Sequence, residues 1–429
     1  MRNSRQFLVA STWMRLTISL LTCGHQLCAV DRPVEFKDSQ TGQSASIETR
    51  KISPSISQGT GPTPTFFEGQ WGKLGVRELI LEIPDAHAAL CEELETWKSG
   101  TEWKFNCDIG TVARILRNSG LNESIIATLT NPPFFQDRMG ITTILPPDEI
   151  LLDLTPQMRS LLYPQIGLPV RENKFQNATQ FISGGFPRLA KTPSGLSKQT
   201  FDLINHLTYS KKGGGLYFSD LMLALSKAAN DEERFRIVKS IAREISLHAW
   251  LELSDESDRE AILSYWSAGE RNQTGRTTLE AILENPEIRR LDLVHILPSL
   301  PKRLIHTYPA REEGLGNDMP DCFATAFSFF SNSMSPRMLD SESVLEIHSE
   351  RYERATAPWK LGDVMMIQAP DGQWVHACNF VAGEILLTKN GQSSNSPWVF
   401  QTINEVLSNY LVDQSMQAFF FRLKPGFLE

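Results

Sequence analysis

Cys322, in the segment NDMPDCFATAFSFF (residues 317–330), is the residue of this 429-residue sequence whose type and position best suit a reactive nucleophile. Asp321, preceded by Pro320, predicts a helix that begins at the cysteine. Free backbone amides and the helix dipole favour an anion there, and the thiolate is the reactive form of cysteine. The same amides can help to form an oxyanion hole. Taken alone, however, this segment is better explained as a buried cysteine on an apolar helix.

A histidine on a predicted strand supplies a candidate base for this cysteine. His376 lies in GDVMMIQAPDGQWVHACNF (residues 362–380), where a strand would hold its ring rigidly, as a general base requires. Strand alternation puts Cys378 on the same face. Asn390 ends the next predicted strand and could orient the imidazole, although Asn-Gly is also a turn signal. The three residues Cys322, His376 and Asn390 therefore form the predicted catalytic site.

The elements around these residues predict one helix followed by an antiparallel meander. Strands are expected at residues 363–368, 373–380, 385–389 and 417–423, with turn signals such as Pro-Asp-Gly between them. The chain before residue 300 has mainly helical periodicity instead. Helices are expected at residues 86–97, 112–116, 125–129, 216–229, 231–245, 257–266 and 277–283. The predicted fold class is thus α+β, with a mainly helical region over 67–300 and a helix packed on an antiparallel sheet over 303–429.

Three short motifs carry a resemblance to a known family. Asp321-Cys322, Gly362-Asp363-Val364 and His376-Ala377 occur in the order of papain-like enzymes, and they resemble the NlpC-type cell-wall peptidases and their CHAP-type amidase relatives. The resemblance covers residues 303–429. Phe323 departs from it, since such families usually carry a small residue there.

The resemblance implies a papain-like domain that hydrolyses amide bonds through a thioester on Cys322, with His376 as base. An exported enzyme of this type would cut peptidoglycan peptides, and it would need no metal, nucleotide or organic cofactor. Two alternatives stay open: a non-catalytic binding protein with a degenerate hydrolase domain, and a transglutaminase-like acyl transferase. A metal site made of Cys322, His376 and Cys378 is disfavoured, because only three ligands are visible.

Composition narrows the class of partner. The chain carries a net charge of −8 and is 41% hydrophobic and 21% charged, which is ordinary for a globular protein. It has no dense block of lysine and arginine, so a nucleic-acid partner is not expected. The length predicts at least two domains. Cys91 and Cys107 could form a disulfide or remain as two buried thiols.

The first 30 residues have the pattern of an export signal. A basic start with Arg2 and Arg5 precedes an apolar stretch over residues 7–21, which Arg15 interrupts. We therefore expect a secreted or periplasmic protein, with lipidation at Cys23 as a lesser alternative. No other stretch approaches the length of a membrane-spanning helix. Residues 31–66 are rich in Ser, Thr, Gly and Pro and predict a disordered linker.

The export signal predicts a mature chain that begins near Ala29 or Val30. N-terminal sequencing of the protein from its native host should find no Met1. An intact Met1 on cytosolic protein would contradict the expectation.

Overall fold

A computed structural model describes two short strands near the N-terminus and most of the chain after residue 62. The described residues are 35–37, 44–46 and 63–427, without 90, 139, 168–178, 182–184, 190–193, 212–213, 310–318, 392–394 and 411–414. The predicted export signal lies outside them. Within the predicted linker, β1 (Glu35–Lys37) pairs antiparallel with β2 (Ser44–Ser46). The rest of residues 31–62 lies outside the described part.

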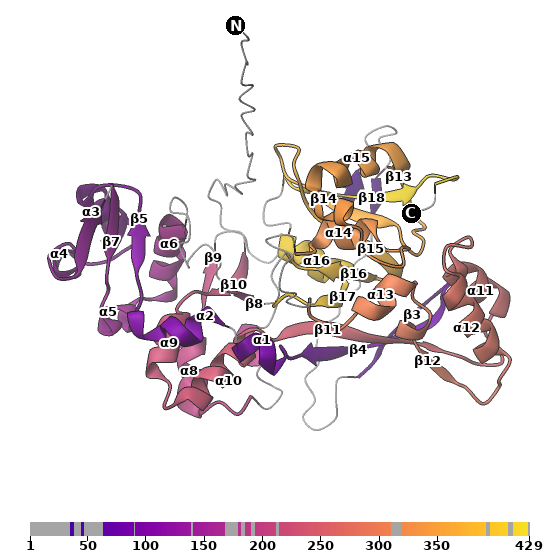
Figure 1. Cartoon of the computed structure of the whole chain (residues 1–429), viewed down its shortest axis with the longest axis horizontal. Helices are drawn as coiled ribbons and strands as arrows, with labels where there is room; N and C mark the ends of the chain where they lie inside the picture. Colours follow the sequence, from indigo (N-terminus) through magenta and orange to yellow (C-terminus); the bar gives the residue numbers. More distant parts are fainter. Residues whose placement is uncertain are drawn as a thin grey trace, which may run out of the picture.

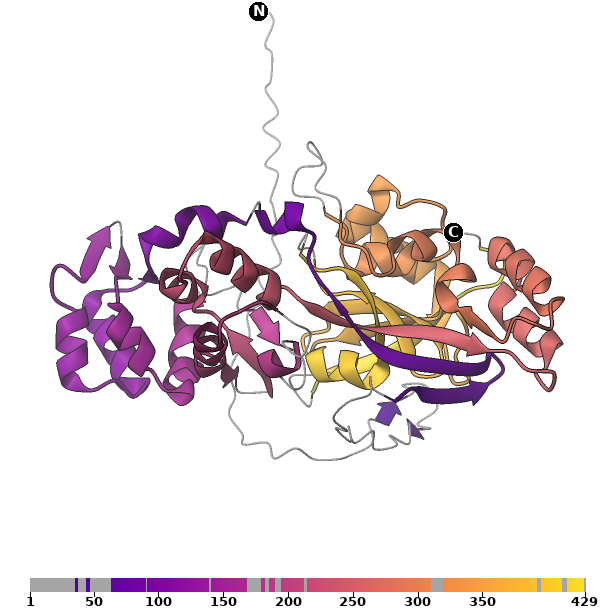
Figure 2. The same cartoon turned by 90° about the horizontal axis from the view of Figure 1, so that it is seen from below.

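The α+β fold class is confirmed. Helices alternate with several sheets, and every pairing between the described strands is antiparallel. Figure 1 and Figure 2 show an elongated molecule with a helix-rich lobe at one end and the largest sheet toward the other. Among the described residues, no helix is long and apolar enough to cross a membrane.

The C-terminal part is built on a six-stranded sheet with the order β13-β18-β14-β15-β16-β17. Its strands are β13 (Tyr352–Arg354), β14 (Val364–Gln368), β15 (Trp374–Ala382), β16 (Ile385–Lys389), β17 (Trp398–Thr402) and β18 (Gln417–Leu423). Four of these strands lie where the sequence predicts them. The helices α14 (Cys322–Phe327) and α15 (Ser341–Arg351) pack on one face, and α16 (Ile403–Tyr410) packs on the other.

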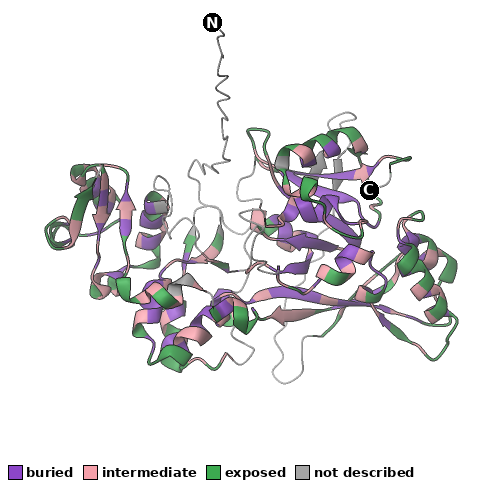
Figure 3. Ribbon diagram, viewed as in Figure 1, coloured by how far each residue is buried: buried purple, intermediate pink, exposed green. Residues whose placement is uncertain are grey.

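The two faces of this sheet follow from strand alternation. Ala377 packs in the core beneath α14 and α15, whereas Cys378 and Phe380 pack against α16. Figure 3 shows the buried colour concentrated on the strands of this sheet, with exposed residues on the helices around them. The buried sheet therefore holds the residues of the candidate site in fixed positions.

The region from 67 to 300 contains more strand than the sequence predicts. A four-stranded sheet has the order β12-β11-β4-β3, and its bounds are β3 (Thr65–Gly69), β4 (Gly72–Leu81), β11 (Glu244–Glu252) and β12 (Arg290–Asp292). The helix predicted to run to Ile245 is wrong at its end, because α10 (Asp231–Ile241) stops before β11. Both faces of β11 are buried, and its sequence EISLHAWLE alternates polar and apolar residues over most of its length. This alternation is a strand signal, and the helical interpretation of residues up to 245 overlooked it.

The apolar core continues across residue 300. Leu247 and Leu251 of β11 share one core with Ile385 and Phe400 of the six-stranded sheet. Ser246 adds a polar link, since its Oγ accepts from the Phe400 amide at 2.9 Å. The two sheets therefore stabilise each other.

The remaining elements form the helix-rich lobe and the helical pair beside β12. The lobe contains α1 (Asp85–Ala89), α2 (Glu92–Thr96), α3 (Ile109–Asn118), α4 (Glu123–Leu129), α5 (Asp148–Asp153), α6 (Pro156–Gly167), α7 (Gly185–Leu189), α8 (Lys198–His206), α9 (Leu221–Lys227) and α10, with two small sheets: β5 (Trp103–Phe105), β7 (Ile141–Ile144), β6 (Phe135–Arg138), and β8 (Thr179–Phe181), β10 (Gly214–Phe218), β9 (Tyr209–Lys211). Three helices follow outside it: α11 (Arg259–Ser267), α12 (Gln273–Leu283) and α13 (Ser299–Leu304). Within residues 216–229, where the sequence predicts a helix with Phe218-Ser219-Asp220 near its start, α9 begins directly after Asp220, and residues 216–218 belong to β10.

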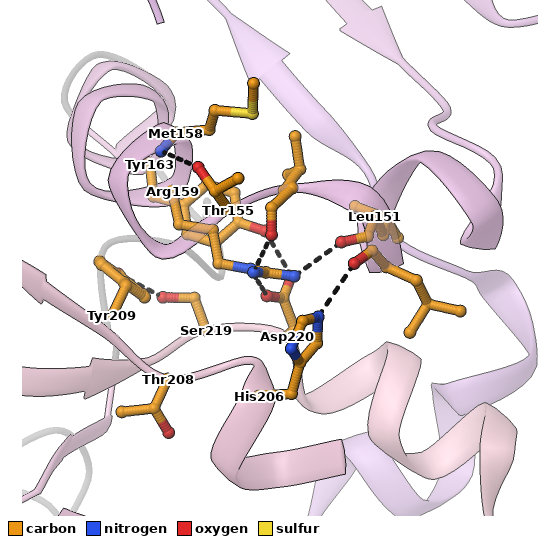
Figure 4. Close-up of polar contacts among 12 residues, drawn as sticks. Leu151, Thr155, Met158, Arg159, Tyr163, His206, Thr208, Tyr209, Ser219 and Asp220 are labelled. Atoms are coloured by element: carbon orange, nitrogen blue, oxygen red, sulfur yellow. Dashed lines mark hydrogen bonds and ion pairs between the residues drawn. The ribbon is translucent and has the colours of Figure 1, made fainter. Parts of the chain in front are cut away.

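A buried ion pair holds this lobe together (Figure 4). Arg159 on α6 donates to the Asp220 carboxylate at 3.0 Å, and both side chains are fully buried. Tyr163 donates to the other carboxylate oxygen at 2.7 Å, and Arg159 also donates to the carbonyls of Leu151 and Leu154. Every charged group in this network has partners, which is the arrangement that a buried structural ion pair requires.

Removal of one partner should therefore destabilise the lobe strongly. Asp220→Ala should lower the free energy of unfolding by about 3–5 kcal/mol, since it leaves the Arg159 charge buried alone. Asp85→Ala is the control, because Asp85 pairs with Lys239 at an exposed position and should cost under about 1 kcal/mol. Urea unfolding measures both. A double variant, Arg159→Met with Asp220→Leu, should lower the free energy of unfolding by less than Asp220→Ala alone does. An equal or greater decrease in the double variant would contradict this account.

Candidate active site

Cys322 is the first residue of α14, as the sequence predicts. The Asp321 carboxylate caps the helix by accepting from the Ala324 amide at 2.8 Å. Burial, with help from the Asp321 charge, raises the pKa of the Cys322 thiol to about 12. The backbone amides of Ala377, Phe323 and Cys322 itself act in the opposite direction, and their effect is smaller. The resting group is therefore a thiol.

His376 lies on β15 and is fully buried. Its imidazole stacks on the Tyr410 ring, with 3.8 Å between the ring centroids and 14° between the planes. Burial lowers the pKa of His376 to about 3, so the imidazole is neutral near pH 7. The cysteine and the histidine are thus both uncharged in the folded protein.

A hydrogen-bond chain fixes the tautomer of this imidazole. Nε2 of His376 lies 2.9 Å from Thr388 Oγ1, and the Thr388 hydroxyl donates to Asn390 Oδ1 over a longer 3.4 Å. Tyr410 donates to the same oxygen at 3.3 Å, while Asn390 Nδ2 donates to Gln401 Oε1 at 3.4 Å. Because the Thr388 proton goes to Asn390, its oxygen accepts from Nε2–H. The lone pair of the imidazole is then on Nδ1.

Nδ1 of His376 is buried and has no hydrogen-bond partner among the residues that the structure describes. Such an atom is costly in a folded protein unless it serves a purpose. The predicted hydrogen bond between Cys322 sulfur and a ring nitrogen is not formed. The backbone amide of Ala377, the residue directly after His376, is one of the groups that act on the Cys322 sulfur. The His376 ring itself lies on the α16 face of the sheet, against Tyr410, whereas α14 packs on the other face.

Asn390 does not orient the imidazole directly, which corrects the role that the sequence predicts for it. Thr388 occupies that position, and Asn390 contacts the ring only through the Thr388 hydroxyl. Thr388 was missed because a threonine on a strand is an ordinary β-branched residue. The available signal was strand alternation, which puts Thr388 and Asn390 on one face of the sheet.

Lys389 is a second residue of the site that the sequence did not indicate. Its side chain is fully buried, and Nζ donates to the Gly391 carbonyl at 2.6 Å. Burial lowers the pKa of Lys389 to about 8, opposed by the charges of Cys322 and Asp321. A cation therefore lies within electrostatic reach of the sulfur, where it favours any negative charge that forms there.

The other cysteines take no part in this arrangement. Cys378 is buried, its Sγ lies 3.8 Å from the Met365 carbonyl, and burial raises the pKa of its thiol. Cys91 and Cys107 are not joined by a disulfide. Within the described ranges, no group of three or more His, Cys, Asp or Glu side chains could hold a metal ion.

No family model, curated protein or solved structure matches this chain. The resemblance to NlpC-type peptidases rests on the motifs of its last third, and the chemistry must be argued from the geometry above.

The buried neutral imidazole predicts acid sensitivity. The pKa of His376 is about 3 when folded and about 6.5 when unfolded, so its contribution to stability is complete above pH 6.5 and is lost as the pH falls toward 3. The loss should be about 1.4 kcal/mol for each pH unit in that window. His376→Gln, which can still reach Thr388, should reduce this slope in urea unfolding at several pH values. His295→Gln, at an exposed position, should not, and equal slopes for wild type and His376→Gln would contradict the buried neutral state.

Proposed function

We propose that the protein is a cysteine hydrolase that cleaves amide bonds, with Cys322 as nucleophile, His376 as general base and Thr388 as the residue that orients the base. The observation that carries the proposal is the unpartnered lone pair on buried Nδ1 of His376, beside the strand residue whose amide acts on the Cys322 sulfur. A proton acceptor without a proton donor is what a base needs before substrate arrives.

The neutral state of both groups sets the order of events. As the sulfur attacks the amide carbonyl, the thiol proton moves to Nδ1 of His376, so the nucleophile and the base act together. The imidazolium keeps its Nε2–H bond to Thr388 and then gives its new proton to the leaving amine. Water attacks the resulting thioester and gives a proton to Nδ1, which then passes it to the departing sulfur, so that the acid and the free thiol are released. Lys389 and the amides at the start of α14 favour the transient negative charge.

The substrate class follows from the resemblance and from the export signal. NlpC-type enzymes act on peptides of the cell wall, and a secreted or periplasmic protein would meet such peptides. We therefore propose peptidoglycan peptides as the substrate. Cys322 is only 6% exposed and the ring of Tyr410 covers one face of the His376 imidazole, so a peptide can reach these two side chains only after a local rearrangement.

A non-catalytic binding protein is the second candidate, and one observation favours it. Burial keeps the Cys322 thiol and the His376 imidazole neutral, so no thiolate–imidazolium pair is ready in the closed state. Such a site would also suit a degenerate hydrolase that binds peptides without cutting them.

Substitution separates the two candidates. Cys322→Ala should abolish release of new amino termini from peptidoglycan peptides, because removal of a nucleophile costs several orders of magnitude in rate. Thr388→Val should lower kcat by roughly 10- to 100-fold, less than the roughly 10⁴-fold cost of losing a charged orienting residue. Asn390→Ala should have a smaller effect, since it acts through Thr388. Mass spectrometry of the products measures each rate.

Cys378→Ser is the matched control, since this buried cysteine has no chemical step, and it should keep its activity. An added amine tests for acyl transfer, which would appear as a product heavier by the amine. Turnover that survives Cys322→Ala would overturn the proposal. Tight peptide binding by wild type without any turnover would support the binding protein instead.

A further inference from the structure

An open surface cavity of about 580 Å³ lies beside β12 and α12, away from the candidate active site. Figures 1 and 2 place these two elements at the end of the molecule far from α16. The apolar part of its lining consists of Ile282, Ile288 and Leu291. The polar part contains Arg290, Asp292 and two histidines. The volume is in the range that holds a small organic molecule.

Arg290 is the notable group of this lining. Its guanidinium lies 3.7 Å from the ring centroid of Trp250, which holds it in place. Trp250 is itself buried and donates through Nε1 to Glu252 at 2.5 Å. Among the residues that the structure describes, none forms a hydrogen bond or an ion pair with the Arg290 side chain. A positioned guanidinium thus presents unused donors at the cavity.

The one carboxylate of the lining is already engaged. Asp292 Oδ1 accepts from His248 Nε2 at 2.8 Å, and His248 Nδ1 accepts from Arg77 Nε at 3.1 Å. Arginine can only donate, so the proton of this imidazole must be on Nε2. Asp292 is therefore held by His248. The positive charge of Arg77, on the far side of the His248 ring, offsets the negative charge of Asp292.

His295 also lines the cavity, is exposed, and makes no side-chain hydrogen bond within the described ranges. Because Asp292 is paired with His248, Arg290 is the charged group of the lining that a ligand can meet. A guanidinium favours an anionic ligand.

We propose that this cavity binds a small organic carboxylate, with Arg290 as its anchor and the three aliphatic residues as the wall for its apolar body. The planar fork of a guanidinium matches the two oxygens of a carboxylate. The wall of isoleucine and leucine excludes a bare inorganic anion as the best ligand, because it would leave apolar surface uncovered. The proposal does not depend on the hydrolase function.

Octanoate is the probe, since it has a carboxylate and an apolar chain and contains no amide. Calorimetry and saturation-transfer NMR on the full chain should detect its binding, whereas octan-1-ol and inorganic phosphate should bind at least about tenfold more weakly. Arg290→Gln should weaken octanoate at least about tenfold, and Arg290→Lys should recover only part of the loss. Arg289→Gln is the control, because Arg289 pairs with Asp255 instead and should leave the affinity unchanged.

Thermal unfolding should show that the Arg290 variants are folded, and His295→Ala gives a second test at another residue of the cavity lining, with weaker octanoate binding expected. Three results would each overturn the proposal: no octanoate binding to wild type, equal binding of octan-1-ol, or an affinity that Arg290→Gln leaves unchanged.

Discussion

The strand β11 must be buried on both faces, and most of the architecture depends on this constraint. Its backbone pairs with β4 along its whole length, and its apolar side chains enter a core that also contains strands of the six-stranded sheet. Burial of so much apolar surface is the dominant favourable term for folding. Because this core is shared, the sheet that carries His376 cannot shift without disturbing β11. The candidate site is therefore supported by a hydrophobic core to which both halves of the chain contribute.

Burial also determines the electrostatics of the site. The same low-dielectric surroundings raise the pKa of Cys322 and lower the pKa of His376, so charge separation is unfavourable before substrate enters. Backbone amides at the start of α14 and the Lys389 ammonium act in the opposite direction. Burial outweighs the amides and Lys389, so Cys322 and His376 are neutral in the folded protein. In the proposed reaction, the amide dipoles would stabilise a charge that develops only as the sulfur attacks.

The sequence identified local signals well and long-range pairing poorly. The cap at Asp321, the strand that bears His376 and the bounds of β16 follow from short-range rules on capping, alternation and turns. β4 and β11 are far apart in the sequence, so their pairing has no local signal, even though EISLHAWLE itself alternates as a strand does. Thr388 was missed for a related reason: its role depends on which strand lies beside β15. Only the three-dimensional register reveals such a partner.

The shared core has a consequence for how the chain can be divided. A fragment that starts at residue 303 would retain Cys322, His376 and Thr388, but it would expose the apolar surface around Ile385 and Phe400 that β11 covers. It would also lose the Ser246 hydroxyl that pairs with the Phe400 amide. Such a surface promotes aggregation. The last third of the chain is therefore continuous in sequence but does not form an independent folding unit, because part of its core is covered by β11.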